Sequence, residues 1–228
     1  MTIHVALSGG MDSTSLLAYL TDAYPGVPIR AYGFNYGQRH AIELRAATQV
    51  ADHYGVPFEV LDLPRLSSPA LTDGGPVPHG HYAHDTMTLT VVQGRNLLFA
   101  STLIGRTQAR DAIAVGVHAG DHAIYPDCRP SFWQPFATAV RAAYDVNVLV
   151  PFITFDKAEI AKIGHEYGAP LHLTWSCYEG GQGPTAEPIH CGRCGTCVER
   201  AEAFHLAGVP DPTPYADAEF WKEAVANA

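Results

Sequence analysis

Short apolar runs alternate with longer amphipathic stretches along most of this chain. In the stretch 39–54, Ile42, Ala46, Val50 and Tyr54 recur at helical spacing before Gly55, which predicts a helix that ends there. The apolar runs have the length of buried strands, and we predict strands at 3–7, 29–35, 58–63, 111–117 and 146–150. Further helices are predicted at 13–20, 96–110, 157–168, 198–207 and 218–226.

The regular alternation of strands and helices predicts an α/β fold with a doubly wound parallel sheet and helices on both faces. Two segments interrupt it. The stretch 64–94 is rich in Pro, Gly, His and Thr, and loops of that length are usually functional or mobile. The second interruption is a cysteine-rich segment between Cys177 and Cys197.

The composition is that of a folded protein without a strongly basic surface. Apolar residues make up 47% of the 228, which is enough for a large core without disulfide bonds. A formal net charge of −9 argues against non-specific binding to nucleic acid or to an anionic membrane. Since neither a transmembrane run nor a signal peptide is recognisable, we expect a cytoplasmic protein.

A glycine-containing loop joins the first predicted strand to the first helix, with the sequence Ser8-Gly9-Gly10-Met11-Asp12-Ser13. Glycines let backbone N–H groups approach a ligand closely, and a helix N-terminus adds partial positive charge. The carboxyl end of a strand in an open parallel sheet is also where ligands bind. The loop therefore predicts an anion site that suits phosphate, although a plain strand-to-helix turn would look similar.

Four of the five cysteines are close together near the C-terminus, at Cys177, Cys191, Cys194 and Cys197. Two overlapping C-x-x-C pairs suit a structural Zn²⁺ held by four thiolates, and an iron–sulfur cluster is the alternative. The segment has little apolar content, so we expect the metal to hold its shape. We expect an α/β domain at 1–170 and a helical, metal-binding segment at 171–228, packed together as one unit.

The loop at 8–13 resembles the SGGxDS motif, or PP-loop, of the ATP pyrophosphatase superfamily. Other stretches resemble one branch of it, the 7-cyano-7-deazaguanine synthase (QueC) family. They are Tyr36-Gly37-Gln38-Arg39-His40 with Glu43, Gly94-Arg95-Asn96, Gly120-Asp121, Tyr125-Pro126-Asp127-Cys128-Arg129, Lys157 with Glu159, and Thr174-Trp175-Ser176-Cys177-Tyr178. The resemblance covers the whole chain and implies a Rossmann-like fold of the adenine-nucleotide alpha-hydrolase type.

The resemblance also implies an activity. Members of the family convert 7-carboxy-7-deazaguanine, ammonia and ATP into the nitrile 7-cyano-7-deazaguanine, through adenylated intermediates and an amide. This makes the chain a ligase that forms carbon–nitrogen bonds in queuosine biosynthesis, with Mg²⁺ accompanying ATP and a structural Zn²⁺. The expected partners are these small molecules and a second copy of the chain in a homodimer, without direct binding of nucleic acid or membrane.

Site residues follow from the same resemblance. ATP would be bound by Leu7, Ser8, Gly9, Gly10, Met11, Asp12, Ser13, Thr14, Arg95 and Lys157. The deazaguanine acid would be bound by Tyr36, Gln38, Arg39, His40, Asp121, Tyr125, Asp127 and Arg129. Catalytic roles are predicted for Asp12, Ser13, Arg95, Lys157 and Asp127.

Individual side chains support some of these roles on chemical grounds. The guanidinium forks of Arg95 and Arg129 match a phosphate or a carboxylate. A carboxylate at Asp127 could accept two hydrogen bonds from a guanine-like edge, although an Asp that stabilises a turn would look the same. Lys157 could contact a phosphate, or be a solvated lysine in the first turn of a helix. Cys128 could be a nucleophile, but the adenylate route needs none, which favours a packing role.

Three other functions remain open at this stage. A related enzyme could activate the same acid and transfer it as an amide to another acceptor, such as a protein amine. Sulfur insertion into a tRNA base is disfavoured by the acidic charge and by cysteines that bind metal. A nucleotide-binding module without catalysis is the last alternative.

Overall fold

The fold is built on a five-stranded parallel sheet in the order β3-β2-β1-β4-β5. The computed structural model describes residues 1–38, 42–182 and 188–228. Its sheet strands are β1 (Ile3–Ala6), β2 (Ile29–Asn35), β3 (Phe58–Asp62), β4 (Ala112–Ala114) and β5 (Asn147–Leu149). The first strand lies in the centre, with Ile3 opposite Ile29 of β2 on one side and opposite Ala112 of β4 on the other. The parallel α/β fold predicted from the sequence is confirmed.

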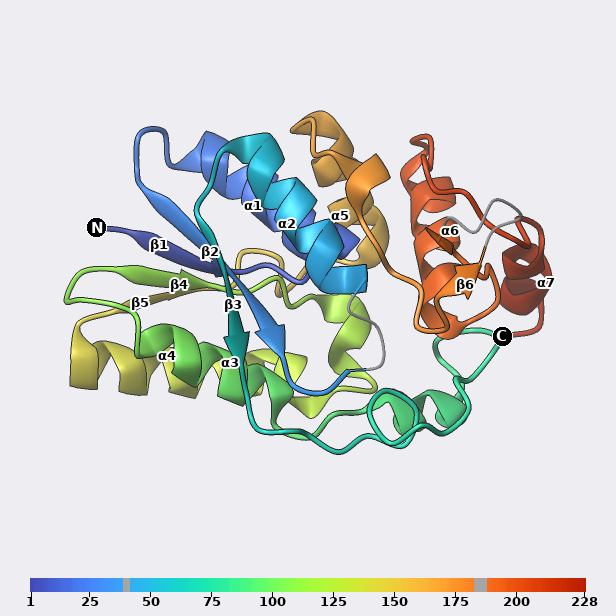
Figure 1. Cartoon of the computed structure of the whole chain (residues 1–228), viewed down its shortest axis with the longest axis horizontal. Coiled ribbons are helices and arrows are strands. Elements are labelled where there is room, and N and C mark those ends of the chain that lie inside the picture. The colour runs from blue at the N-terminus through green and yellow to red at the C-terminus, as the bar shows by residue number, and fades with distance from the viewer. Residues whose placement is uncertain (39–41, 183–187) are drawn as a thin grey trace.

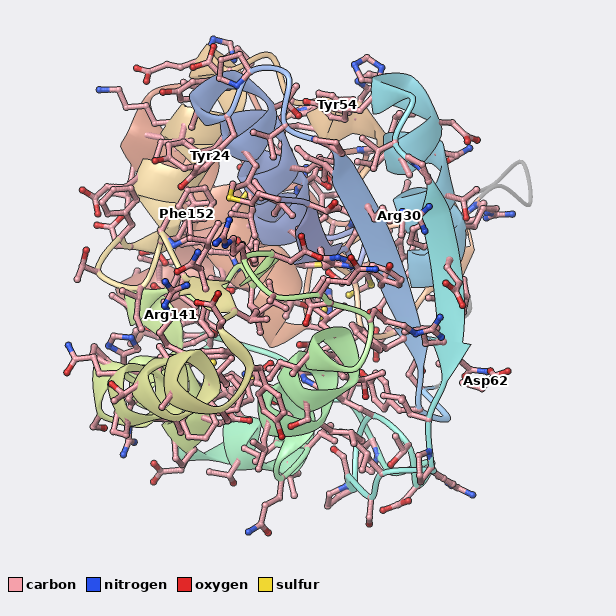
Figure 2. All side chains as sticks on the ribbon, turned by 90° about the vertical axis from the view of Figure 1, so that its left-hand side faces the viewer. Tyr24, Arg30, Tyr54, Asp62, Arg141 and Phe152 are labelled. Carbon is pink, nitrogen blue, oxygen red and sulfur yellow. The ribbon has the colours of Figure 1, made fainter. Side chains whose placement is uncertain are left out.

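Helices cover both faces of the sheet (Figure 1). One face carries α1 (Met11–Ala23), α2 (Ile42–Tyr54) and α5 (Lys157–Glu166), and the other carries α3 (Arg95–Ile104) and α4 (Pro130–Tyr144). Figure 2 views these layers from the amino ends of the strands, where Arg30 is labelled. None of the helices in the described ranges is long and apolar enough to cross a membrane.

The side chains of the strands explain this layering. Ile3 and Val5 of β1 pack in the core under α1 and α5, together with Leu16 and Ile160. Tyr32 and Phe34 of β2 belong to the opposite core, with Trp133 of α4. Successive strand residues point to opposite faces, so a strand buried on both sides needs a nearly continuous apolar run.

The helix α4 is absent from the sequence-based prediction, which left 118–145 without an element. Two prolines obscured it: Pro130 begins the helix, where a missing N–H is harmless, but Pro135 lies within it. The spacing of Trp133, Phe136 and Val140, all of which pack in one core, was the available signal. The strand β4 is also shorter than the predicted 111–117, and helix α3 ends at Ile104, before Gly105.

The C-terminal segment lies at the carboxyl ends of the strands (Figure 1). It contains a small hairpin, β6 (Gly181–Gln182) with β7 (Pro188–Ile189), and the helices α6 (Gly195–Ala207) and α7 (Phe220–Ala226). Arg200 of α6 is fully buried and donates to Thr174 Oγ1 at 2.8 Å and to the Leu171 carbonyl at 3.1 Å. This buried guanidinium therefore holds α6 against residues 171–174, which follow α5 in the chain.

Candidate active site

A cavity lies at the carboxyl ends of β1 and β4, between the sheet and the C-terminal segment. The strand order reverses between these two strands, because β2 and β3 extend from one side of β1 and β5 extends from the other side of β4. Such a reversal opens a crevice at the carboxyl edge of a doubly wound sheet, where ligands bind. The loop that follows β1 and residues 115–117 after β4 both line the cavity.

The loop between β1 and α1 is held in shape by its own hydroxyl groups. Ser13 Oγ accepts a hydrogen bond from Ser8 N at 3.2 Å, and Ser8 Oγ accepts one from Gly10 N at 3.3 Å. The Gly9 carbonyl accepts from Trp175 N at 2.8 Å, which ties the loop to the C-terminal segment. The loop is therefore held both by its own hydroxyl groups and by the C-terminal segment. Its residues Ser8, Gly10 and Ser13 line the cavity.

At position 9 of the loop, only glycine fits. Its φ of +82° lies in the left-handed region that glycine adopts readily. A Cβ at this position would lie 2.5 Å from both the Ala47 nitrogen and the Glu43 carbonyl oxygen of α2. Any side chain here would push the loop away from α2, so Gly9 supports the loop without lining the cavity.

Lys157, the first residue of α5, brings a positive charge to the loop. Its Nζ donates to Asp12 Oδ2 at 2.8 Å and lies 3.3 Å from His118 Nε2. Glu199 Oε2 of α6 is 3.2 Å from the same nitrogen. His118 Nε2 also lies 3.4 Å from Asp121 Oδ2, so it is close to both an ammonium and a carboxylate.

The charges of Lys157, Asp12 and Glu199 affect one another's pKa. Burial acts to lower the pKa of Lys157, but the Asp12 and Glu199 carboxylates outweigh it and raise the pKa above its ordinary value. Burial acts to raise the pKa of Asp12, but Lys157 and His118 outweigh it and lower the pKa. Lys157 and Asp12 are consequently both ionised at neutral pH, which places an ammonium beside the loop.

The other end of the cavity is aromatic. Phe34 and Phe99 stack with ring centroids 4.1 Å apart, and Tyr36, Tyr125 and Tyr178 line the same region. Arg95, at the start of α3, also lines it. Such a wall suits a flat, partly polar ring, and the guanidinium suits an anionic group attached to that ring.

Glu43 of α2 lines the cavity close to Arg95. Burial raises the pKa of Glu43 to about 7, although the Arg95 guanidinium opposes this shift. A carboxyl group that titrates near neutral pH inside a cavity can exchange protons with a ligand.

The structure brings most of the predicted site residues to this one cavity. Those that line it are Leu7, Ser8, Gly10, Met11, Asp12, Ser13, Tyr36, Gln38, Arg95, Asp121, Tyr125 and Lys157. Gly9 and Thr14 lie behind the lining, as Thr14 is fully buried in α1. Arg39 and His40 lie outside the described residues.

Asp127 and Arg129 are not among the lining residues, and the structure gives them other partners. Asp127 Oδ2 accepts from Asn96 N at 3.1 Å and so caps the N-terminus of α3, next to Arg95. Arg129 Nε donates to the His122 carbonyl at 2.7 Å. Asp127 thus lies at the end of α3 beside Arg95, and Arg129 contacts the 122–129 turn, while the substrate-binding roles of both residues stay predictions.

Cys128 is the fifth cysteine, and its surroundings favour the neutral thiol. It is 2% exposed, and burial raises its pKa, with the Asp121 and Asp127 carboxylates adding to the effect. Its Sγ accepts from Asn96 Nδ2 at 3.3 Å and lies 3.7 Å from Asp121 Oδ2. Cys128 also lines the cavity, but these surroundings favour a hydrogen-bonded packing role over that of an activated nucleophile.

We expect Cys128→Ser to keep at least about a third of wild-type kcat, because a hydroxyl can make the same two hydrogen bonds. Steady-state kinetics with saturating substrates measures this. Cys128→Ala separates the packing contribution from the hydrogen bonds. A complete loss of turnover in the serine variant, with an unchanged melting temperature, would show that the thiol takes part in chemistry.

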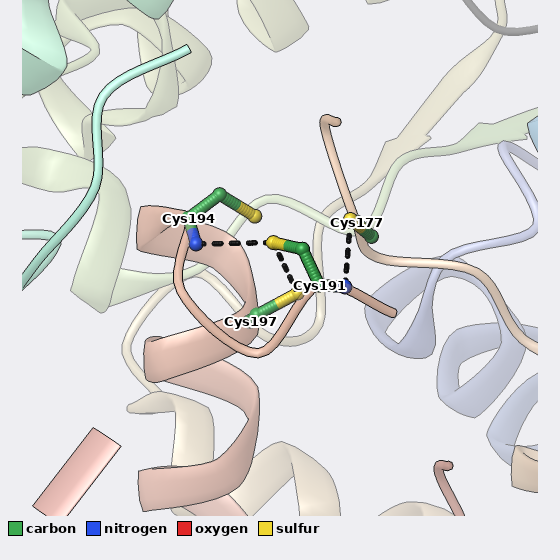
Figure 3. A group of neighbouring side chains, drawn as sticks. All are labelled: Cys177, Cys191, Cys194 and Cys197. Carbon is green, nitrogen blue, oxygen red and sulfur yellow. Dashed lines mark hydrogen bonds between the residues drawn. The ribbon is translucent and has the colours of Figure 1, made fainter. Parts of the chain in front are cut away.

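The four clustered cysteines can hold a metal ion. Their Sγ atoms all lie within 4.8 Å of one another, and Sγ of Cys191 is 3.8 Å from that of Cys197 (Figure 3). A tetrahedral ion with metal–sulfur bonds of about 2.3 Å needs sulfur atoms about 3.8 Å apart, so the cluster fits such an ion. His190 lies beside the cluster, but its Nε2 accepts from Ser176 N at 3.0 Å.

Some cavity residues had no signal in the sequence. Glu199 lies in a predicted helix, and a lone acidic residue there reads as a solvated one. Tyr82, Met87 and Thr90 come from the long 64–94 loop, which reaches the C-terminal segment through a hydrogen bond of 3.0 Å from Gly80 N to the Arg193 carbonyl. A long loop rich in Pro and Gly indicates function, but not which of its residues face a ligand.

The family model described as queuosine biosynthesis protein QueC matches residues 2–208, a range that includes both the loop and the four cysteines. This chain belongs to the QueC family. The 7-cyano-7-deazaguanine synthase of Paracoccus denitrificans is 48% identical over 233 residues, covering 98% of this chain and 97% of that protein. The synthase of Allorhizobium ampelinum is 47% identical over 237 residues, covering 100% of this chain and 97% of that one.

Among solved structures, NMN synthetase from Francisella tularensis matches 97% of this chain and 83% of its own, with a TM-score of 0.46 and 14% identity. Nothing about function follows from a similarity of that size. The QueC family predicted from the sequence motifs is confirmed by the family model and by the two synthases.

Proposed function

We propose that this protein is a 7-cyano-7-deazaguanine synthase, which converts 7-carboxy-7-deazaguanine, ammonia and ATP into the nitrile. The observation that carries the proposal is one cavity with two chemically different ends. The Ser8–Ser13 loop and Lys157 suit phosphate at one end, and the tyrosines with Arg95 suit a planar acid at the other. The two synthases named above, which match the full length of the chain, support the same reaction.

The proposed chemistry needs two activations. In the first, a carboxylate oxygen of the acid attacks the α-phosphorus of ATP and pyrophosphate leaves. Ammonia then attacks the acyl carbon, a proton is lost, and AMP leaves to give the amide. In the second, the amide oxygen attacks the α-phosphorus of another ATP and pyrophosphate leaves, and loss of AMP and of both N–H protons then gives the nitrile. Both activations form the same kind of bond, so one phosphate site serves for both.

The cavity supplies groups suited to these steps. Backbone N–H groups of the loop and the N-terminus of α1 would bind the phosphates, and Lys157 would balance the charge that develops as pyrophosphate leaves. Arg95 would hold the acid, because Asp127 fixes the end of α3 that carries it. Asp12 and Asp121 offer carboxylate oxygens that suit the Mg²⁺ accompanying ATP.

The metal of the cysteine cluster is proposed to be a structural Zn²⁺. Four thiolates leave no open coordination position, so the ion would stabilise the segment and take no part in the reaction. The hydrogen bond from Trp175 N to the Gly9 carbonyl supports the view that 1–170 and 171–228 work as one unit.

Mass spectrometry of the products formed from 7-carboxy-7-deazaguanine, ATP and ammonium tests the proposal. We expect the nitrile, two AMP for each nitrile, and an amide that accumulates when ATP is limiting. An amide attached to a protein amine would favour the alternative acceptor, which the named relatives do not support. Absence of any adenylation of the acid would reject the function.

A further inference from the structure

Glu199 is a buried carboxylate that the proposed reaction does not use. It is 7% exposed, it lies in the second turn of α6, and it lines the cavity. Its Oε2 is 3.2 Å from Lys157 Nζ. A buried carboxylate is costly unless it has a partner of opposite charge, and Lys157 provides one for Glu199.

The surroundings of Lys157 Nζ leave little room for a further acceptor. An ammonium has three N–H groups; Asp12 accepts a hydrogen bond from one of them at 2.8 Å, and His118 Nε2 lies 3.3 Å from Nζ. Glu199 lies at the position of a third partner. A phosphate oxygen that binds Lys157 must compete with one of these three groups.

Of these three partners, Glu199 is the carboxylate that comes from outside the loop. Asp12 is closer to Nζ and belongs to the loop itself, while His118 is enclosed at 1% exposure. Glu199 comes from another segment, its Oε2 is 3.2 Å from Nζ, and its side chain borders the cavity. A phosphate carries the same sign of charge as Glu199, so the two anions repel each other while they compete for one cation.

We propose that Glu199 is a positioning residue for Lys157 that competes with the nucleotide phosphate, so that it weakens ATP binding while it fixes the ammonium for the reaction. The proposal rests on the proposed ATP-dependent function. It also gives the C-terminal segment a direct effect on the phosphate site, since Glu199 follows the cluster residue Cys197 by two positions on α6. The position of Lys157 would then be fixed by Glu199 of α6 and by Asp12 of the loop.

Two charge-removing variants, Glu199→Gln and Glu199→Ala, test this in the full chain. Calorimetry with a non-hydrolysable ATP analogue measures the dissociation constant, and steady-state kinetics with the acid measures kcat. We expect the analogue to bind about 3- to 10-fold more tightly, as for removal of one nearby like charge. We expect kcat to fall about 10-fold, because Lys157 is held less firmly. General structural damage would instead weaken binding.

Two further variants complete the test. Glu199→Asp keeps the charge but shortens the side chain, so binding of the analogue should return to the wild-type range while kcat stays low. Glu166→Gln removes an exposed carboxylate from α5, which pairs with Lys162 away from the cavity, and controls for net charge. It should change neither quantity.

The outcomes separate this inference from the proposed function. Unchanged or weaker binding in both charge-removing variants, beside normal binding by wild type, would overturn the role of Glu199 alone. An unchanged kcat would overturn it as well. If wild type bound no ATP analogue and adenylated no acid, the proposed function would be rejected together with it.

Discussion

Asp12→Ala is expected to lower acid-dependent release of pyrophosphate at least about 100-fold, the effect of losing one preorganised charge at a reaction centre. The reason is the 2.8 Å hydrogen bond from Lys157 Nζ to Asp12 Oδ2. Without Asp12, the ammonium is left to Glu199 and His118 and moves away from the loop. Measurement of pyrophosphate release with saturating ATP and acid checks this.

The fold should survive the substitution, since Asp12 is in the first turn of α1 and its side chain is only partly buried. Circular dichroism and the melting temperature establish that. Asp22→Asn is the matched control, because this exposed carboxylate belongs to the last turn of the same helix. Near wild-type pyrophosphate release by Asp12→Ala would remove the loop from the reaction centre.

Replacing Cys194 and Cys197 together by serine is expected to abolish metal binding and to destabilise the C-terminal segment. Elemental analysis should find about one zinc in each wild-type chain and almost none in the double variant. Structural zinc sites bind their ion with a free energy of roughly 10–16 kcal/mol. If about 4 kcal/mol of this stabilises the folded chain, loss of the metal lowers the melting temperature by about 8–16 °C. Calorimetric scans measure the shift.

Activity should fall at least about 10-fold when the metal is lost, because α6 begins at this cluster and carries Glu199 to Lys157. Cys128→Ser is the control, since this cysteine lies outside the cluster and should leave the zinc content unchanged. Iron with visible absorption in the wild-type protein would replace zinc by an iron–sulfur cluster. Full zinc occupancy in the double variant would disprove the ligand assignment.

These two predictions concern two segments that meet at one cavity. The loop after β1 is local in sequence, whereas the C-terminal segment contributes Trp175, Ser176, Tyr178, Gly195, Thr196 and Glu199 to the lining, together with part of the 64–94 loop. The hydrogen bond from Trp175 N to the Gly9 carbonyl and the ion pair between Lys157 and Glu199 join the two. Damage at the cysteine cluster is therefore expected to reach the phosphate site without any change in the loop.

The sequence by itself determined the features that depend on local chemistry. Alternating apolar runs and amphipathic stretches predicted the parallel sheet, because burial on both faces demands such runs. The Ser8–Ser13 loop was evident because few residues tolerate its backbone, as the φ of Gly9 shows. The cysteine spacing predicted the metal cluster, since four thiolates so close in sequence can reach one ion.

Only the tertiary structure decided which distant residues meet in the cavity. Lys157 and Asp12 are 145 positions apart, and Asp127 caps a helix that begins 32 positions before it. A charged side chain looks the same in sequence whether it faces solvent or a buried partner. Its role is fixed by packing, because burial removes water and leaves the nearest opposite charge to stabilise it, as Lys157 does for Glu199.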